Sequence, residues 1–225
     1  MNGATLQAGR SERAHERVAA IETEKPRTPD YELTQRAAEG DMKAFEELYQ
    51  RHNRRVYSLC LRMTGNVVEA EDLAQHVFLQ VYKSAHRYEV SAKFSTWIFT
   101  IARNLCLNEI RRRTRHPADS LDATSTEDDQ PLIQVEDRKN FSAPDAVLHR
   151  ELESKIEEAI GALPEKQRIA LLMCREDELS YEDMAKVLGC SLSATKSLIH
   201  RARETLKEVL KPYLRTGVWR EAENS

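Results

Sequence analysis

Apolar residues recur every three or four positions in three stretches of the first half of the chain, which are residues 45–63, 70–82 and 97–105. This period places apolar side chains on one face of an α-helix, so each stretch predicts an amphipathic helix. Helices of this length gain most of their stability by packing their apolar faces against one another. We therefore predict a compact bundle of three or four helices over residues 30–115.

Polar residues between these stretches predict where the helices begin and end. Gly65 follows the first stretch, and Asn66 with Glu69 three residues later predicts the N-cap of the second helix. Ser95 predicts the N-cap of the third helix. The spacing places Tyr82 on the apolar side of the second helix.

The middle of the chain has a different composition. Residues 116–137 contain seven acidic residues and no Lys or Arg, together with prolines and several Ser and Thr. Such a segment buries too little apolar surface to fold alone, which predicts a flexible acidic linker over residues 116–143. By the same reasoning residues 1–29 form a disordered arm, and residues 215–225 are left as a tail.

A second helical block is predicted over residues 144–214. Ser180 and Asp183 predict a capped short helix, Gly189 predicts a tight turn after it, and a further helix then runs to Leu210. The inner positions of that last helix are Thr195, Ile199, Ala202 and Leu206. This order matches a helix-turn-helix. The predicted fold class is all-α, with two small helical domains joined by the acidic linker.

The outer face of the last helix carries short hydroxyl side chains and long cationic ones. Such groups suit contacts with phosphates and base edges in a DNA major groove. We predict DNA binding by this face, against the alternative of a solvated charged face on an ordinary helical hairpin. The predicted contacts are Ser193, Lys196, Ser197, His200, Arg201 and Arg203.

A second basic surface lies at the end of the first block. Residues 103–115 contain five Arg and one Glu, a local charge of +4. Guanidinium and amide groups bind a nucleic-acid backbone, and aromatic rings hold unstacked bases. The aromatic residues here could instead belong to the bundle core. The predicted contacts are Tyr88, Trp97, Asn104, Asn108, Arg111 and Arg112.

The outer face of the second helix offers a third candidate surface. Asp72, Gln75 and Leu79 lie on it at helical spacing. A leucine within a polar stripe fits a protein-docking patch, but single exposed apolar residues are also common on any protein surface. Both interpretations stay open from the sequence.

Composition narrows the class of protein. The chain has 34 Lys and Arg against 37 Asp and Glu, so its formal net charge is −3. This balance excludes a protein that binds nucleic acid through bulk charge alone, but it allows local basic surfaces. Only 7 Gly and 7 Pro occur in 225 residues, which favours a mostly helical protein.

Candidate catalytic and metal chemistry is missing from the sequence. The chain contains no nucleotide-binding, hydrolase or metalloprotease motif, so we expect no enzyme, cofactor or catalytic residue. The four cysteines are far apart and fit no metal site, so we expect each to be a small buried apolar residue. No apolar run is long enough to cross a membrane, and no secretory signal is present, which predicts a cytoplasmic location.

Several ordered motifs resemble those of bacterial sigma factors. Residues 70–75 (AEDLAQ) and 94–98 (FSTWI) are similar to region 2, and residues 163–168 (LPEKQR) and 195–203 are similar to region 4. Only a short linker separates the two regions, as in the extracytoplasmic-function group. The resemblance extends over residues 30–214. One departure is Leu198, where the family commonly has an arginine.

The resemblance implies a role and a set of partners. A protein of this family binds core RNA polymerase, recognises the −10 and −35 elements of promoter DNA, and promotes transcription initiation. The surface with Asp72, Gln75 and Leu79 would dock on the β′ clamp, and the second block would rest on the β flap. The surface on the third helix would hold the −10 strand, and the last helix would read the −35 duplex. An anti-sigma factor is a further implied partner.

Two other classes remain as alternatives at this point. The first is a DNA-binding regulator whose first domain senses a ligand or dimerises, which would bind duplex DNA without polymerase. The second is a helical enzyme, which would require a clustered polar site.

Overall fold

The structure is a computed structural model that describes residues 29–88, 92–115, 143–176 and 178–216, without the side chains of residues 143–149 and 214–216. Nearly all of the predicted arm, acidic linker and tail therefore lie outside the described residues.

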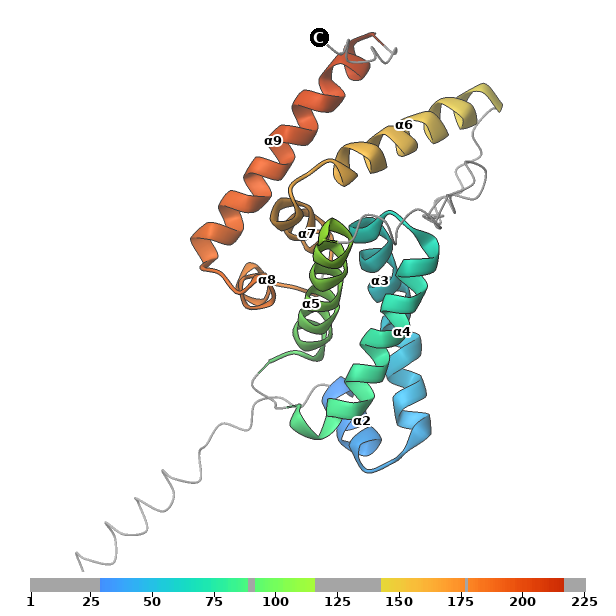
Figure 1. The fold of residues 1–225 in the computed structure, drawn as a ribbon, viewed down its shortest axis with the longest axis vertical. Coiled ribbons are helices and arrows are strands. Elements are labelled where there is room, and N and C mark those ends of the chain that lie inside the picture. Colours follow the sequence, from blue (N-terminus) through green and yellow to red (C-terminus); the bar gives the residue numbers. More distant parts are fainter. Residues whose placement is uncertain (1–28, 89–91, 116–142, 177, 217–225) are drawn as a thin grey trace, which may run out of the picture.

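The first block consists of helices that pack side by side (Figure 1). They are α2 (Pro29–Ala38), α3 (Met42–Thr64), α4 (Val67–Ser84), the short 3-10 helix η1 (Ala85–Arg87) and α5 (Phe94–Arg115). The predicted bundle is thus present with four α-helices, the first of which, α2, precedes the three stretches that the apolar pattern identified. The side chains of α3, α4 and α5 supply most of its core.

The second block is also helical throughout its described part. Its helices are α6 (Ala143–Gly161), α7 (Glu165–Met173), α8 (Tyr181–Leu188) and α9 (Leu192–Thr216). The prediction that the last helix ends at Leu210 is wrong, because α9 continues through Pro212. Tyr213, one residue further, is only 8% exposed, so burial of its ring helps to hold the helix beyond the proline.

The predicted helix ends agree with the structure at one site and differ at another. Gly65 adopts a left-handed conformation, with φ of 70°, and donates its N–H to the Leu61 carbonyl over 2.7 Å. The Asn66 side chain accepts a hydrogen bond from the Glu69 N–H over 3.0 Å, as predicted. The predicted N-cap at Ser95 is wrong, because α5 already begins at Phe94 and the Ser95 residue is 4% exposed inside its first turn.

The cysteines follow the prediction only in part. Cys60 of α3 and Cys106 of α5 are fully buried in the first block, and their Sγ atoms lie 3.8 Å apart. The hydrogen bond with the Cys106 thiol, and then burial, raise the pKa of Cys60 far above that of a free cysteine, so its thiol is inert at neutral pH. Cys174 and Cys190 are only half-buried.

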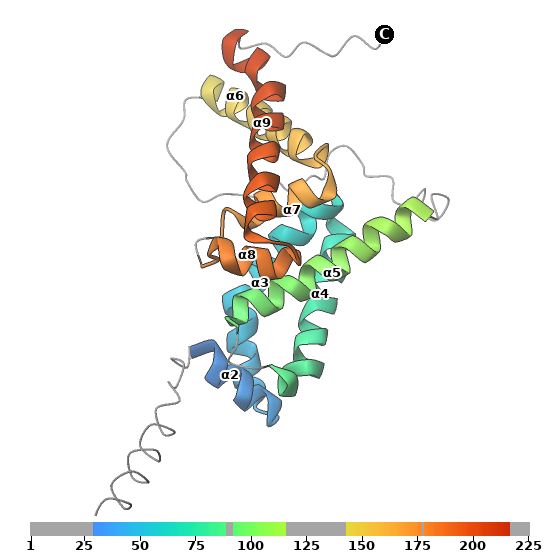
Figure 2. The same ribbon diagram turned by 90° about the vertical axis from the view of Figure 1, so that its left-hand side faces the viewer.

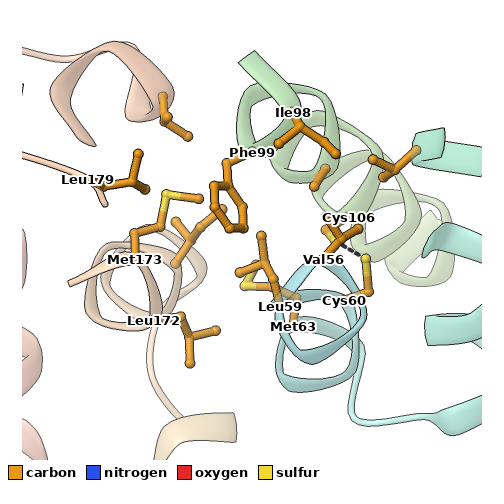
Figure 3. Close-up of a cluster of buried hydrophobic side chains, with 14 of the residues drawn as sticks. Val56, Leu59, Cys60, Met63, Ile98, Phe99, Cys106, Leu172, Met173 and Leu179 are labelled. Carbon is orange, nitrogen blue, oxygen red and sulfur yellow. Dashed lines mark hydrogen bonds between the residues drawn. The ribbon is translucent and has the colours of Figure 1, made fainter. Parts of the chain in front are cut away.

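The two helical blocks pack directly against each other, which the sequence did not predict. Helix α5 contacts α8, and α3 contacts α6 and α7 (Figure 2). Phe99 points from α5 toward Met173 of α7, and Leu179 lies beside them (Figure 3). Phe99 and Met173 are each 1% exposed. Burying side chains of this size stabilises a contact by about 1.5–3 kcal/mol each.

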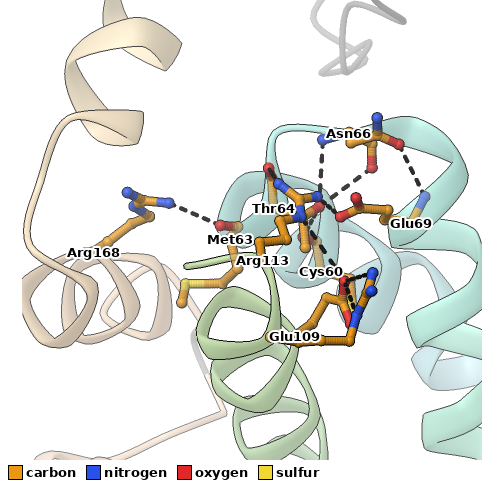
Figure 4. Close-up of polar contacts among 9 residues, drawn as sticks. Cys60, Met63, Thr64, Asn66, Glu69, Glu109, Arg113 and Arg168 are labelled. Carbon is orange, nitrogen blue, oxygen red and sulfur yellow. Dashed lines mark hydrogen bonds and ion pairs between the residues drawn. The ribbon is translucent and has the colours of Figure 1, made fainter. Parts of the chain in front are cut away.

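Polar contacts surround this apolar junction. Arg168 of α7 donates to the Met63 carbonyl at the end of α3 over 2.8 Å (Figure 4). Four ion pairs among the described residues also join the blocks. They are Lys93–Asp183 at 3.1 Å, Arg62–Glu157 at 3.0 Å, and Arg55 with Glu178 at 2.8 Å and with Glu176 at 3.8 Å. Because each has a partner that solvent reaches, they contribute about 0–1 kcal/mol each, less than the apolar contact.

Within the first block, Asp30 attaches α2 to α3. Its carboxylate accepts hydrogen bonds from Arg51 Nη1 over 2.8 Å and pairs with His52 Nε2 over 3.1 Å. The hydrogen bond with His52, together with Arg51, lowers the pKa of the Asp30 carboxyl despite its partial burial. The native fold therefore favours the charged form of Asp30.

We predict that Asp30→Asn lowers the free energy of unfolding at pH 7 by about 1–2 kcal/mol. Because the pKa of Asp30 is lower in the native state, its contribution is complete above the ordinary value of 3.8 and is lost as the pH falls through the lower native value. Urea unfolding of both proteins at several pH values measures this difference. The exposed control Asp72→Asn should show no such loss; an Asp30→Asn loss that stays constant from pH 7 to pH 3 would contradict the assignment.

Candidate nucleic-acid interface

The turn between α8 and α9 is fixed by local hydrogen bonds. Ser180 and Asp183 form a complete capping box, in which the Asp183 N–H donates to Ser180 Oγ over 3.1 Å and the Ser180 N–H donates to the Asp183 carboxylate over 3.3 Å. Gly189 ends α8 with φ of 64°, a conformation that side chains with a Cβ rarely adopt. This sequence of cap, short helix and glycine turn positions the start of α9.

The inner face of α9 is anchored against the same block. Thr195 is fully buried, and its hydroxyl donates to the Ser191 carbonyl over 3.1 Å. Ile199 and Ala202 are also buried, whereas Leu206 is only half-buried. Burial of this face leaves the opposite face of α9 exposed, as the helix-turn-helix pattern predicts.

The exposed face of α9 contains an open hollow of about 620 Å³. Its lining includes five of the six residues predicted to read the −35 element. The lining residues are Leu192, Ser193, Lys196, Ser197, His200 and Arg201. The sixth predicted residue, Arg203, lies outside it and donates from Nη2 to Sγ of Cys174, the residue directly after α7, over 3.2 Å. The structure therefore brings together a polar, cationic surface without Arg203.

Tyr181 belongs beside this surface, and sequence reasoning missed it. The Lys196 Nζ atom lies 5.8 Å from the centroid of the Tyr181 ring, within the range of a cation–π contact. Tyr181 is 40% exposed. Its position directly after the cap residue Ser180 was the one available signal. The ring restricts the Lys196 side chain at the edge of the hollow.

The second predicted surface lies along α5. Asn104, Asn108 and Arg111 are exposed and follow one another at three- and four-residue spacing. Arg112 is exposed as well, and its guanidinium pairs with Glu109 over 2.8 Å. Asn104 accepts a hydrogen bond from Arg103 over 3.2 Å. These side chains form one continuous amide and guanidinium stripe.

The two aromatic residues predicted for this surface belong to a ring cluster. Tyr88 stacks on Trp97 with ring centroids 5.0 Å apart, and its hydroxyl donates to the Ala92 carbonyl over 2.8 Å. Tyr88 is 6% exposed, and burial raises its pKa to about 12. Trp97 is half-buried. In this arrangement Trp97 keeps part of its surface open to solvent, whereas the Tyr88 ring is covered.

The third predicted surface is the outer face of α4. Asp72, Gln75 and Leu79 are all exposed, and Leu79 is 47% exposed. The expectation that Tyr82 belongs to the buried side is wrong, because Tyr82 is 41% exposed, although its ring is edge-to-face with that of Phe45 with the ring centroids 5.2 Å apart. Tyr82 extends the same stripe at three-residue spacing from Leu79. The face is therefore more apolar than the sequence pattern suggested.

Other kinds of site are not found in the described part of the chain. Within those residues no three His, Cys, Asp or Glu side chains are grouped so that they could hold a metal ion. The helices that the structure describes are also too short or too polar to cross a membrane.

Family models match both helical blocks. The model for Sigma-70 region 2 matches residues 48–116, and the model for Sigma-70, region 4 matches residues 153–206. The first match includes the surfaces on α4 and α5, and the second includes the helix-turn-helix and the hollow on α9.

Two curated proteins are similar over most of the chain. RNA polymerase sigma-H factor of Pseudomonas aeruginosa is 34% identical over 190 residues, which are 83% of this chain and 96% of that protein. ECF RNA polymerase sigma factor SigW of Bacillus subtilis is 34% identical over 172 residues, 76% of this chain and 91% of that protein.

Solved structures share the fold. The sigma factor RpoE of Bartonella quintana, solved in complex with the anti-sigma factor NepR, matches with a TM-score of 0.59 at 24% identity over 75% of this chain and 98% of that chain. CnrH, solved in complex with the cytosolic domain of CnrY, also matches with a TM-score of 0.59, at 20% identity over 81% of this chain and 97% of that chain.

Proposed function

Because the chain belongs to the extracytoplasmic-function group of sigma-70 family sigma factors, which initiate transcription with core RNA polymerase and are not enzymes, we propose that its two blocks divide promoter recognition between them. The observation that carries this proposal is the pair of exposed cationic surfaces on different blocks. One of them follows a helix-turn-helix, and the other is a stripe on α5.

The hollow on α9 reads the −35 duplex. Lys196 and Arg201 supply long cationic side chains that reach base edges or phosphates, while Ser193, Ser197 and His200 supply shorter polar ones. Leu198 is half-buried, so at this position the chain offers no cation where the family commonly has an arginine. Arg203 contacts a DNA phosphate only if its hydrogen bond with Cys174 breaks.

The stripe on α5 holds the −10 strand once the duplex opens. Asn104, Asn108, Arg111 and Arg112 bind its backbone and bases, and Trp97 stacks on an unpaired base at the end of the stripe. Tyr88 joins them only if its contact with Trp97 opens, because its ring is covered in this arrangement.

The outer face of α4 docks on the β′ clamp through Asp72, Gln75 and Leu79, and the second block rests on the β flap. The exposed apolar area of Leu79 and Tyr82 supports protein docking over a merely solvated face. The protein works in the cytoplasm, and an anti-sigma factor regulates it, as the complexes of the structural neighbours suggest for this fold.

Reading both promoter elements requires the blocks to separate. The centres of the −10 and −35 elements are about 25 base pairs apart, which is about 85 Å of duplex at about 3.4 Å per base pair. In the structure Gly189, in the turn before α9, lies close to α5, because a Cβ atom placed on it would be 4.0 Å from Nη1 of Arg103. The packed arrangement therefore reads one promoter element at a time, and binding to polymerase separates the blocks.

We predict that Asp72→Arg combined with Leu79→Ala reduces binding to core polymerase at least tenfold, because it removes an apolar contact and reverses a charge on the docking face. Competition binding with core polymerase and in vitro transcription from a genomic template measure the effect. Glu46→Arg, a charge reversal on the exposed side of α3, is the control and should bind normally. If the double variant binds core polymerase as the wild type does, the α4 face is merely solvated.

The two DNA surfaces should fail at different steps. Lys196→Ala and Arg201→Ala should weaken binding to the −35 element even on fully duplex promoters. We expect a loss of about 1–3 kcal/mol where the removed side chain contacts a base edge. Asn104→Ala and Arg112→Ala should leave −35 protection intact and reduce the permanganate reactivity of −10 thymines. A pre-melted template should rescue these two if their defect is opening alone. Lys207→Ala, further along α9, is the matched control. Equal loss of −35 binding in all four variants would contradict the division between the blocks.

A further inference from the structure

A cavity of about 350 Å³ lies where the two blocks meet, between α3 and α7. Its floor is apolar and comes from both blocks, and its rim is rich in arginine. The floor residues are Leu59, Phe99, Leu172 and Met173. The rim residues are Arg54, Arg55, Ser58, Arg62, Arg175 and Glu176. Its volume falls at the lower end of the range of small-molecule sites, about 300–1,000 Å³.

Arg62 is the most enclosed of these cations. Its side chain is 11% exposed and pairs with Glu157 through Nη2 over 3.0 Å. Its Nε–H is buried and finds no acceptor among the described residues. Burial lowers the pKa of the Arg62 guanidinium and the positive charge of Arg175 lowers it further, while the negative charges of Glu157 and Glu176 partly offset both effects. Arg62 and Arg175 thus line the same cavity from different blocks, and Arg62 has a buried N–H donor without an acceptor in the described part of the chain.

The acidic groups nearby balance the charge of the rim only in part, because four arginines line it and three carboxylates, Glu157, Glu176 and Glu178, lie beside them. Glu176 is the one carboxylate among the lining residues, and it lies 3.8 Å from Arg55. Arg55 is held more closely by Glu178, over 2.8 Å, and by the His52 ring over 3.0 Å. Glu157 and Glu178 each engage one arginine, while Arg175 is exposed at the rim and the Nε–H of Arg62 has no acceptor among the described residues.

We propose that this cavity binds a nucleotide with two or more phosphate groups, whose phosphates contact Arg62 and Arg175 and whose base lies on the apolar floor. Guanidinium groups bind phosphate oxygens through two parallel hydrogen bonds, and a phosphate group satisfies several donors at once. A purely inorganic anion would leave the floor of Leu59, Leu172 and Met173 unused. A purely apolar ligand would leave the buried Nε–H of Arg62 without an acceptor.

The bound nucleotide has a consequence for the arrangement of the blocks. Arg62 belongs to α3 and Arg175 follows α7, so the cavity is complete only when the two blocks are packed together. A ligand that binds only the packed arrangement stabilises it. The nucleotide therefore opposes the separation that promoter reading requires.

Calorimetric titration of the full-length chain, without polymerase or DNA, tests this site. ADP and GDP serve as nucleotide probes, inorganic pyrophosphate as the anion alone, and adenosine as the base and sugar alone. We expect saturable binding of at least one nucleotide at 150 mM salt, binding of pyrophosphate at least tenfold weaker, and no heat from adenosine. Arg175→Ala and Arg62→Gln should each weaken nucleotide binding at least tenfold. Arg150→Ala, an exposed arginine on α6, is the matched control and should not change it.

Several results would overturn the proposal. These are no nucleotide binding at millimolar concentration, equal binding of pyrophosphate and nucleotide, or the same loss with Arg150→Ala as with Arg175→Ala. Thermal unfolding of each variant checks that it folds, and because Arg175 is exposed, its variant keeps the test valid if Arg62→Gln does not fold. Since no polymerase is present, a negative result leaves the proposed promoter function untouched.

Discussion

The burial of Phe99 from α5 against Met173 and Leu179 of the second block is the contact on which the arrangement of the molecule depends. It joins two helical blocks that are each small, and small domains bury a low fraction of their surface. The ion pairs around it are partly exposed and add little by comparison. The apolar contact therefore decides whether the two blocks stay together.

This contact leaves the proposed functional surfaces free. The hollow on α9, the stripe on α5 and the outer face of α4 are all exposed while the blocks are packed. The packing of the blocks therefore restricts how far apart the two DNA-binding surfaces can be. It does not block DNA from reaching either surface. Burial of Phe99 and Met173 corresponds to a few kcal/mol, at about 1.5–3 kcal/mol per side chain. Differential binding of polymerase and promoter to the separated arrangement can offset an energy of this size.

Local sequence signals predicted the elements well and the contacts between them poorly. The helix cap at Asn66, the glycine turn at Gly189 and the inner face with Thr195 and Ile199 depend on neighbours within one or two helical turns, so periodicity and cap residues reveal them. The contact of Phe99 with Met173 joins residues far apart in the chain, and nothing in either segment identifies its partner. For the same reason the sequence could not indicate that Arg203 forms a hydrogen bond with Cys174.

The most direct test of this account is the distance between the two blocks, measured by electron spin resonance between labels at Glu46→Cys on α3 and Lys207→Cys on α9. Cys174→Ser and Cys190→Ser remove the two half-buried thiols, and the fully buried Cys60 and Cys106 should not react. The account predicts one narrow distance distribution in the free protein and an increase of tens of ångströms in a transcriptionally active complex with core polymerase and promoter DNA. An unchanged distance in the active complex would contradict it.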